Sequence, residues 1–137
     1  MAYQITRKNR IIEDLELCNA DGSVAETFHV DLNVDQIAGR LNKARSALAQ
    51  AQADLRDAPD DAQKIEAMGN AIIALFDVIF GEDGRKRIVE FYEDAYTEML
   101  VDVFPFIADV ILPKIEAASE ARKNQLLAAA KTNKRWR

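Results

Sequence analysis

The chain of 137 residues contains very little cysteine, histidine, glycine and proline. Its one cysteine, Cys18, excludes an intramolecular disulfide. Together with the one histidine, His29, it cannot supply the four ligands of a structural zinc site. Five glycines and three prolines argue against a loop-rich or all-β fold. We therefore expect one α-rich domain that folds without disulfides, metal or cofactor.

Long apolar runs are also missing from the sequence. The longest, such as residues 71–76 and 104–108, are far shorter than the roughly 20 residues that span a bilayer. The N-terminal segment MAYQITRKNR has basic residues but no apolar run of signal-peptide length. We expect a soluble, intracellular protein that has no membrane partner.

Catalytic motifs are nearly absent as well. Cys18 and His29 fall on facing strands of a predicted hairpin, but no orienting acid or oxyanion donor accompanies them, so a nucleophilic pair is not expected. The Glu-x-x-His pairs of carboxylate di-metal bundles do not occur. Gly81 and Gly84 stand in a predicted turn between helices without a preceding strand, which argues against a phosphate-binding loop. The sequence predicts a non-enzymatic protein.

Charge is plentiful but unevenly distributed. Residues 1–120 carry 12 of the 18 basic residues and all 23 acidic residues, a net charge of −11. Residues 121–137 contain no acidic residue and six basic ones: Arg122, Lys123, Lys131, Lys134, Arg135 and Arg137. The protein is therefore an acidic body with a basic tail.

The stretch 71–112 holds five of the six phenylalanines and two of the three tyrosines, and we expect it to supply most of the core. Ahead of it, apolar and polar residues alternate over 10–18 and 25–32, on either side of an Asp21-Gly22 turn. This pattern predicts a β-hairpin within residues 10–32. The first ten residues are expected to be disordered or loosely attached.

The first predicted helix begins near Asn33 as N-cap, with Asp35 in its first turn. Apolar residues follow at alternating spacings of three and four: Val34, Ile37, Leu41, Ala44, Leu48, Ala51 and Leu55. This stripe is typical of one helix of an antiparallel pair inside the domain, or of an intermolecular coiled coil. The second helix is expected to start with Pro59 in its first position, pack on the first helix and stop at Gly81.

A third helix is expected from an Asp83 cap to Phe104, after which Pro105 either starts a fourth helix or kinks a long one. Pro113 likewise either starts a new helix or kinks a long one, and the sequence remains typical of a helix to about Ala130. The predicted fold is mainly α: a helical bundle of four or so helices over 33–130, with a small N-terminal β-hairpin. Residues 131–137 are expected to form a frayed basic tail.

Acidic residues recur at every fourth position of the predicted third helix: Glu90, Asp94, Glu98 and Asp102. Such a row is a solvated face or an acidic ridge that meets a basic partner helix; a catalytic carboxylate pair is not expected without a pocket. Aromatic residues on the same segment could form an adjoining apolar groove. The candidate partner-binding residues are Glu90, Phe91, Tyr92, Asp94, Tyr96, Glu98, Asp102 and Phe104.

The basic tail places Trp136 between Arg135 and Arg137, as in some nucleic-acid contacts. Six charges beside a body of net charge −11 make a poor polyanion binder, which disfavours nucleic acid as the partner. The other interpretations are a solvated end, an end folded back on the acidic ridge, or a contact with a protein partner.

The segment LFDVIFGED followed by FYEDAYTEMLVDVFPFI, within residues 75–115, resembles small proteins of the tail assembly chaperone type. These are encoded in the tail-morphogenesis modules of long-tailed phages of Gram-positive bacteria. The resemblance implies a helical, non-enzymatic protein in the cytoplasm of the infected bacterial host. It would coat the long helical tape measure protein and help recruit tail-tube protein subunits.

Two further hypotheses remain open. One is a structural virion or head–tail connector protein that self-associates through the hairpin and the first helix. The other is a nucleic-acid-binding accessory protein that uses the basic tail.

Overall fold

The structure is a computed structural model that describes residues 2–5 and 10–135. Its elements, in chain order, are β1 (Arg10–Cys18), β2 (Val24–Asn33), α1 (Val34–Asp57), α2 (Ala62–Phe91), α3 (Tyr96–Phe106), a π-helical turn (Ile107–Ile111) and α4 (Leu112–Arg135). Helix accounts for 71% of the chain, which confirms the mainly helical class with an N-terminal hairpin. The predicted looseness of the first ten residues concerns a segment of which 1 and 6–9 lie outside the described residues.

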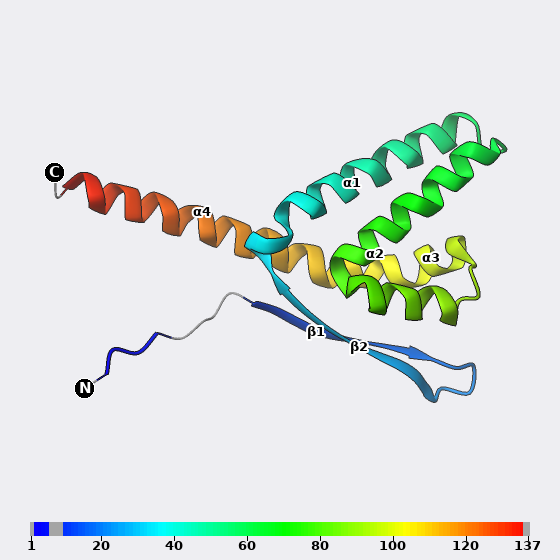
Figure 1. Cartoon of the computed structure of the whole chain (residues 1–137), viewed down its shortest axis with the longest axis horizontal. Helices are drawn as coiled ribbons and strands as arrows, with labels where there is room; N and C mark the ends of the chain where they lie inside the picture. The colour runs from blue at the N-terminus through cyan, green and yellow to red at the C-terminus, as the bar shows by residue number, and fades with distance from the viewer. Residues whose placement is uncertain (1, 6–9, 136–137) are drawn as a thin grey trace.

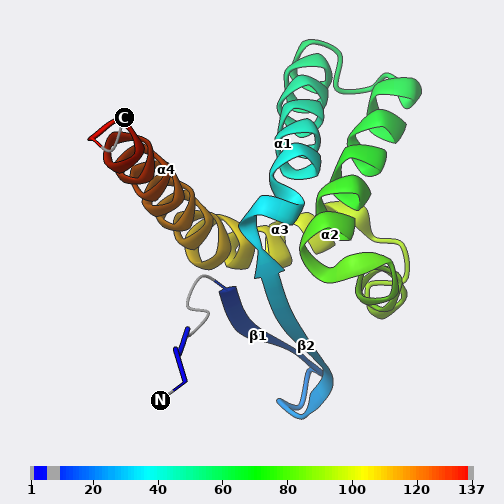
Figure 2. The ribbon, with the colours of Figure 1, turned by 60° about the vertical axis from the view of Figure 1, so that its left-hand side comes forward.

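The described helices form three continuous bodies, not the predicted four or so. α1 and α2 make an antiparallel pair, and α3, the π-helical turn and α4 follow one another without a break. The strands lie on the opposite side of the molecule from the α1–α2 pair, and the C-terminal half of α4 projects beyond both (Figure 1). A second view shows α1 and α4 diverging from a crossing point near the start of α1 (Figure 2).

The β-hairpin forms where the sequence predicts it. Gly22 takes a φ of 88°, a conformation that glycine adopts at little cost, and the Asn19 amide donates to the Ser23 carbonyl at 2.8 Å. The pairing runs from Arg10 opposite Asn33 to a bulge at Leu17 and Cys18. One face of the hairpin is apolar and buried, and its buried residues are Ile11, Leu17, Phe28, Val30 and Leu32.

Charged residues at the margins of that face attach the hairpin to the helices. Glu13 of β1 pairs with Lys114 of α4, and Glu26 of β2 pairs with Arg87 of α2. The Arg87 guanidinium also lies 4.6 Å from the centroid of the Phe28 ring, a cation–π contact. A two-stranded sheet is marginal alone, so these contacts and the buried face hold it in place.

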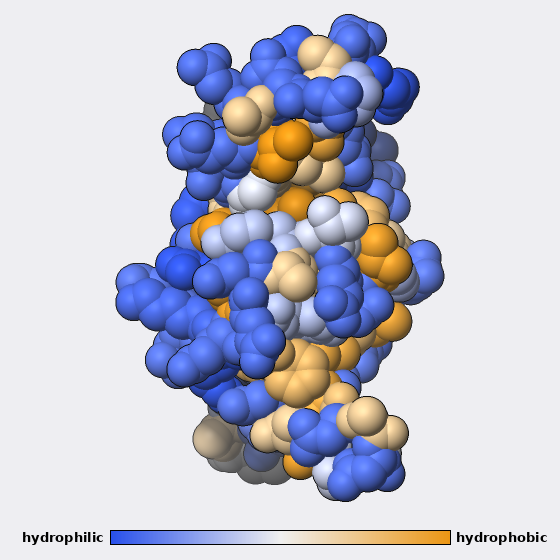
Figure 3. All heavy atoms as spheres, turned by 90° about the vertical axis from the view of Figure 1, so that its right-hand side faces the viewer, coloured by the Kyte–Doolittle hydropathy of each residue, from blue (hydrophilic) through white to orange (hydrophobic). Residues whose placement is uncertain are grey.

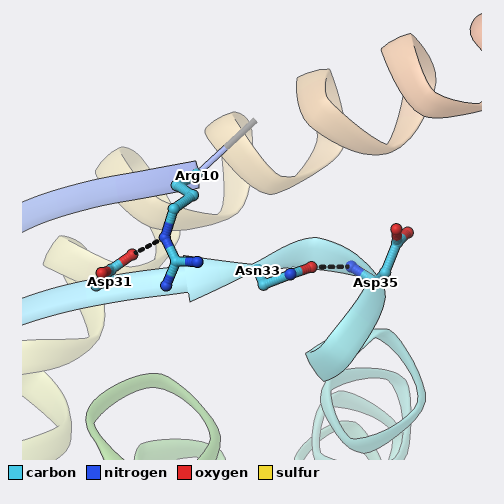
Figure 4. Close-up of polar contacts among 4 residues, drawn as sticks. All are labelled: Arg10, Asp31, Asn33 and Asp35. Atoms are coloured by element: carbon cyan, nitrogen blue, oxygen red, sulfur yellow. Dashed lines mark hydrogen bonds and ion pairs between the residues drawn. The ribbon is translucent and has the colours of Figure 1, made fainter. Parts of the chain in front are cut away.

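The junction of β2 and α1 is capped as expected. The Asn33 side chain accepts a hydrogen bond from the Asp35 amide at 3.1 Å, and Arg10 pairs with Asp31 at 2.7 Å across the strands (Figure 4). Six of the seven stripe residues of α1 are buried, and Leu55 is half-buried. Because this stripe packs against α2, the intramolecular antiparallel pair is confirmed.

The start of α2 differs from the prediction. Pro59 lies in the turn after α1 and not in the first helical position, because Asp61 is the N-cap. The Asp61 carboxylate accepts hydrogen bonds from the amides of Gln63 at 2.9 Å and Lys64 at 3.2 Å. A side-chain acceptor that satisfies two free helix amides fixes the start at Ala62.

Gly81 interrupts α2 at the predicted stop, and α2 comprises two helical segments that meet there. Its φ of 77° and ψ of 167° break the helical geometry, and the flanking segments meet at a kink. The Asp77 carboxylate and the Arg85 guanidinium pair at 2.7 Å across the kink. Phe80 lies next to the bend, with its ring centroid 5.9 Å from Phe28 and 5.7 Å from Phe76. The kink thus turns α2 around an aromatic cluster that joins β2 to the helices.

The prediction of one continuous helix from Asp83 to Phe104 is wrong. α2 continues past Asp83 to Phe91, a turn covers residues 92–95, and α3 begins only at Tyr96. Asp83 lies just after the kink, in the helical segment that continues to Phe91.

The α3–α4 body passes both prolines without ending. Pro105 lies inside α3 and Pro113 inside α4, and the π-helical turn lies between them. In that turn the Leu112 amide donates to the Ile107 carbonyl, five residues back. Each proline removes an amide donor and crowds the preceding turn, and the widened π turn accommodates this. Of the two choices that Pro105 posed, the long helix is confirmed.

The C-terminal end is helical further than expected. α4 extends to Arg135, so the prediction of a frayed tail is wrong for residues 131–135, which belong to a helix. Trp136 and Arg137 lie outside the described residues.

Gly69 offers a test of the packing between α2 and α3. A Cβ at this position would lie 3.8 Å from Cδ2 of Tyr96, an ordinary van der Waals distance. Alanine costs less backbone entropy than glycine in a helix, so Gly69→Ala should raise the free energy of unfolding by about 0.5–1 kcal/mol. Urea denaturation followed by circular dichroism measures this. A lower free energy of unfolding would show that the Tyr96 ring cannot accept the methyl group.

Candidate partner-binding site

The predicted acidic row does not lie along one helix. Glu90 is in the last turn of α2, Asp94 is in the turn, and only Glu98 and Asp102 share a helix, α3. Glu93 and Asp94 have φ values of 51° and 64°, so the chain reverses direction between the first and second halves of the row. The ridge is therefore replaced by a corner, which we call the acidic corner: Glu90, Glu93, Asp94, Glu98 and Asp102.

All five carboxylates of the acidic corner are exposed. Residues 88–113 contain no lysine or arginine, so no basic residue from this segment neutralises them. Figure 3 looks onto the face that carries the α2–α3 turn, where hydrophilic residues surround smaller apolar patches. The five carboxylates are therefore clustered and exposed, and Arg85 and Lys86, which precede this segment, lie near three of them.

The structure brings three of the predicted residues into direct proximity. The Tyr92 hydroxyl donates a hydrogen bond to the Asp102 carboxylate at 3.2 Å. Burial raises the pKa of Tyr92 to about 12, with further contributions from the charge of Asp102, its hydrogen bond and the charge of Glu98. Tyr92, Glu98 and Asp102 therefore form one cluster that connects the turn to α3.

The aromatic candidates lie partly in the core. Phe91, Tyr92, Tyr96 and Phe104 are all half-buried and pack against the hydrophobic core. The rings of Phe91 and Tyr92 meet edge to face, with centroids 5.1 Å apart. The Tyr92 hydroxyl reaches Asp102, but all four side chains are partly buried and already stabilise the fold.

Glu90 and Asp94 belong to a different neighbourhood. With Glu93 they line a shallow hollow of about 330 Å³, whose other walls include Arg85 and Lys86. The eight predicted residues thus divide between this hollow, the Tyr92 cluster and the half-buried aromatics.

The titration of Tyr92 gives a testable consequence of this cluster. Folding raises the pKa of Tyr92 from 10 to about 12, so the unfolded chain loses this proton first as the pH rises. The free energy of unfolding of the wild type should therefore fall more steeply between pH 10 and 12 than that of Tyr92→Phe. Denaturant unfolding of both proteins across this range measures the difference. Parallel pH profiles would contradict the assigned environment of Tyr92.

Sequence reasoning missed a larger feature, an open groove of about 950 Å³ between α1 and α4. The groove residues on α4 are Ile115, Glu116, Ser119, Glu120, Arg122, Lys123, Leu126 and Leu127. On α1 they include Val34, Asp35, Leu41 and Arg45. The residues at helical spacing on this face, Ile115, Ser119, Arg122 and Leu126, include two polar side chains, so the sequence carries no apolar pattern that would indicate it.

Ion pairs join the two walls of this groove. Arg122 pairs with Asp35 at 2.6 Å, and Arg45 lies 4.0 Å from Glu116. Arg122 is the first basic residue of the tail, so the tail starts against α1 and not against the acidic corner. Figure 1 shows α4 leading away from α3, so of the open interpretations of the tail, the fold-back on the acidic residues does not hold for its described part.

A hollow of about 520 Å³ lies between β2, α1 and the kink of α2, with His29 and Arg85 in its lining. The His29 ring nitrogen Nδ1 lies 2.7 Å from the Asp14 carboxylate, and Cys18 faces Val24 further along the hairpin. Cys18 and His29 do not meet. Within residues 2–5 and 10–135, no three His, Cys, Asp or Glu side chains group closely enough to hold a metal ion.

None of the helices in the described ranges is both long enough and apolar enough to span a membrane.

The sequence matches no known protein-family model, no curated protein and no solved structure.

Proposed function

We propose that this protein is a non-enzymatic assembly chaperone of the phage-tail type, which binds the tape measure protein in the cytoplasm of an infected bacterium. The observation that carries the proposal is the acidic corner. Its five exposed carboxylates occupy a segment without lysine or arginine, and one of them, Asp102, accepts a hydrogen bond from the half-buried Tyr92. The same segment lies within the residues that resemble tail assembly chaperones.

The chemistry of the corner favours a long helical partner with basic residues. Exposed carboxylates attract such a helix and set its orientation, while contributing little affinity individually. The aromatic edges provide the apolar contacts that hold a helix once it has docked. A chaperone that has to release its client during tail assembly needs this combination of fast, charge-guided association and limited buried area.

Two alternatives have less support. The stripe of α1, on which a connector protein would rely for self-association, is buried against α2. Of the tail residues that a nucleic-acid-binding protein would use, Arg122 is engaged with Asp35.

Co-expression with a tape measure protein tests the proposal. The wild type should yield a soluble complex, and Glu98→Lys/Asp102→Lys should weaken it about tenfold, because two favourable charge contacts become repulsive. Asp60→Lys/Glu66→Lys is the matched control, since it makes the same charge change at exposed positions on the far end of the α1–α2 pair. Equal recovery with both variants would contradict binding at the acidic corner, and no complex with the wild type would overturn the chaperone function.

A further inference from the structure

The C-terminal half of α4 carries two exposed leucines. This half projects beyond the body of the molecule (Figures 1 and 2), and Leu126 and Leu127 are 65% and 53% exposed. Both leucines lie at the open end of the groove between α1 and α4. A projecting helix of about four turns is marginal in water without tertiary packing. A partner that covers these leucines would stabilise it.

We propose that the occupant of this groove is α4 of a second copy of the chain, lying antiparallel to the first in a closed two-fold dimer. In such a dimer each α4 lies in the groove that the other copy forms from α1 and α4. The same residues then meet on both sides, with Leu126 and Leu127 of the two copies packed together near the axis.

The charge pattern of α4 favours a second copy in this orientation. Glu120 lies six residues before Leu126 and Lys131 lies five residues after it, on the same flank of the helix. An antiparallel pair with its axis near Leu126 places Lys131 of each copy beside Glu120 of the other. A parallel pair would place Glu120 beside Glu120 and Lys131 beside Lys131, which is unfavourable.

The wider charge distribution agrees with this arrangement. Residues 121–135 hold only basic charges, whereas the groove wall on α4 carries Glu120 and, next to Arg45, Glu116. The Arg122–Asp35 pair holds the start of the projecting half against α1. This contact favours the angle between α1 and α4 that the second copy would meet.

Light scattering on the purified protein measures the mass of the particle in solution and so tests the dimer. The wild type should have twice the mass of the 15.4 kDa chain, and Leu126→Asp/Leu127→Asp should have the mass of one chain. Val101→Asp is the matched control, because Val101 is 66% exposed on α3, away from the groove, and this variant should stay dimeric. A monomeric wild type, or an open series of larger oligomers, would overturn the proposal.

Because the leucine variant could also unwind the end of α4, charge exchange provides a second test. Glu120→Lys and Lys131→Glu should each raise the dimer dissociation constant several-fold, and the combined variant should restore it. The two residues lie 11 positions apart on one straight helix, too far for contact within a copy, so restoration identifies an antiparallel contact between copies. A combined variant that dissociates more than either single variant would overturn the arrangement. Dimerisation does not depend on the proposed chaperone function, and its test needs no tape measure protein.

Discussion

Phe76→Ala should lower the free energy of unfolding by about 3–5 kcal/mol, the largest effect of any single substitution that we predict. Phe76 is fully buried, with an exposed fraction of 0%, and its ring meets Phe80 edge to face. Phe80 in turn contacts Phe28 of the hairpin and stacks on Phe106 of α3 at 6.2 Å. Removing Phe76 leaves a cavity where three parts of the fold meet.

Chemical denaturation of the wild type and Phe76→Ala measures this loss. Because domains of this size are stable by roughly 5–15 kcal/mol, the variant should remain folded but with a much lower midpoint. Ile65→Ala is the control, since Ile65 lies exposed on the same helix and should change the stability by less than about 1 kcal/mol. A similar loss for both variants would contradict the placement of the core around the middle of α2.

Gly81→Ala should lower the free energy of unfolding by about 1–3 kcal/mol through backbone strain alone. The φ of 77° and ψ of 167° at Gly81 fall in a region that is nearly exclusive to glycine. A Cβ at this position would have nothing within 4 Å, so steric collision with neighbours does not contribute.

The comparison with Gly69→Ala isolates this effect, because both substitutions add one methyl group to the same helix. They should move the stability in opposite directions, which thermal or urea unfolding would show. If Gly81→Ala were neutral, α2 would be straight in solution and the aromatic cluster would be arranged differently.

The sequence predicts the hairpin and α1 well because local chemistry dominates there. Asp21 and Gly22 allow only a few turn geometries, and Asn33 supplies the side-chain cap that starts α1. The apolar stripe of α1 has one period and one packing partner, so pattern and burial agree.

The α2–α3 turn could not be predicted in the same way. Residues 92–95 contain neither glycine nor proline, and their carboxylates continue a helical four-residue spacing. The turn requires positive φ at Glu93 and Asp94, an unusual conformation for residues other than glycine. We attribute the turn to tertiary packing of α3 on the core, which local propensity does not encode. The candidate site therefore has the predicted residues in an unpredicted arrangement.

The two prolines show the opposite case, in which a strong local signal is overridden. Pro105 and Pro113 would ordinarily end a helix, yet Ile107 and Ile111 between them are fully buried. Burial of this stripe outweighs the lost hydrogen bonds, and the π-helical turn absorbs the mismatch. The groove beside α4 could not be predicted either, because its two walls come from helices about 80 residues apart in the sequence.

The central claim is that the acidic corner binds the partner helix, on a surface separate from the α4 groove. Titration calorimetry of a tape measure protein against three versions of the chain tests this most directly. Glu98→Lys/Asp102→Lys should bind about tenfold more weakly than the wild type, and Lys123→Glu/Lys131→Glu, altered only on α4, should bind with unchanged affinity. Loss of binding in the α4 variant, with full affinity in the corner variant, would contradict the claim.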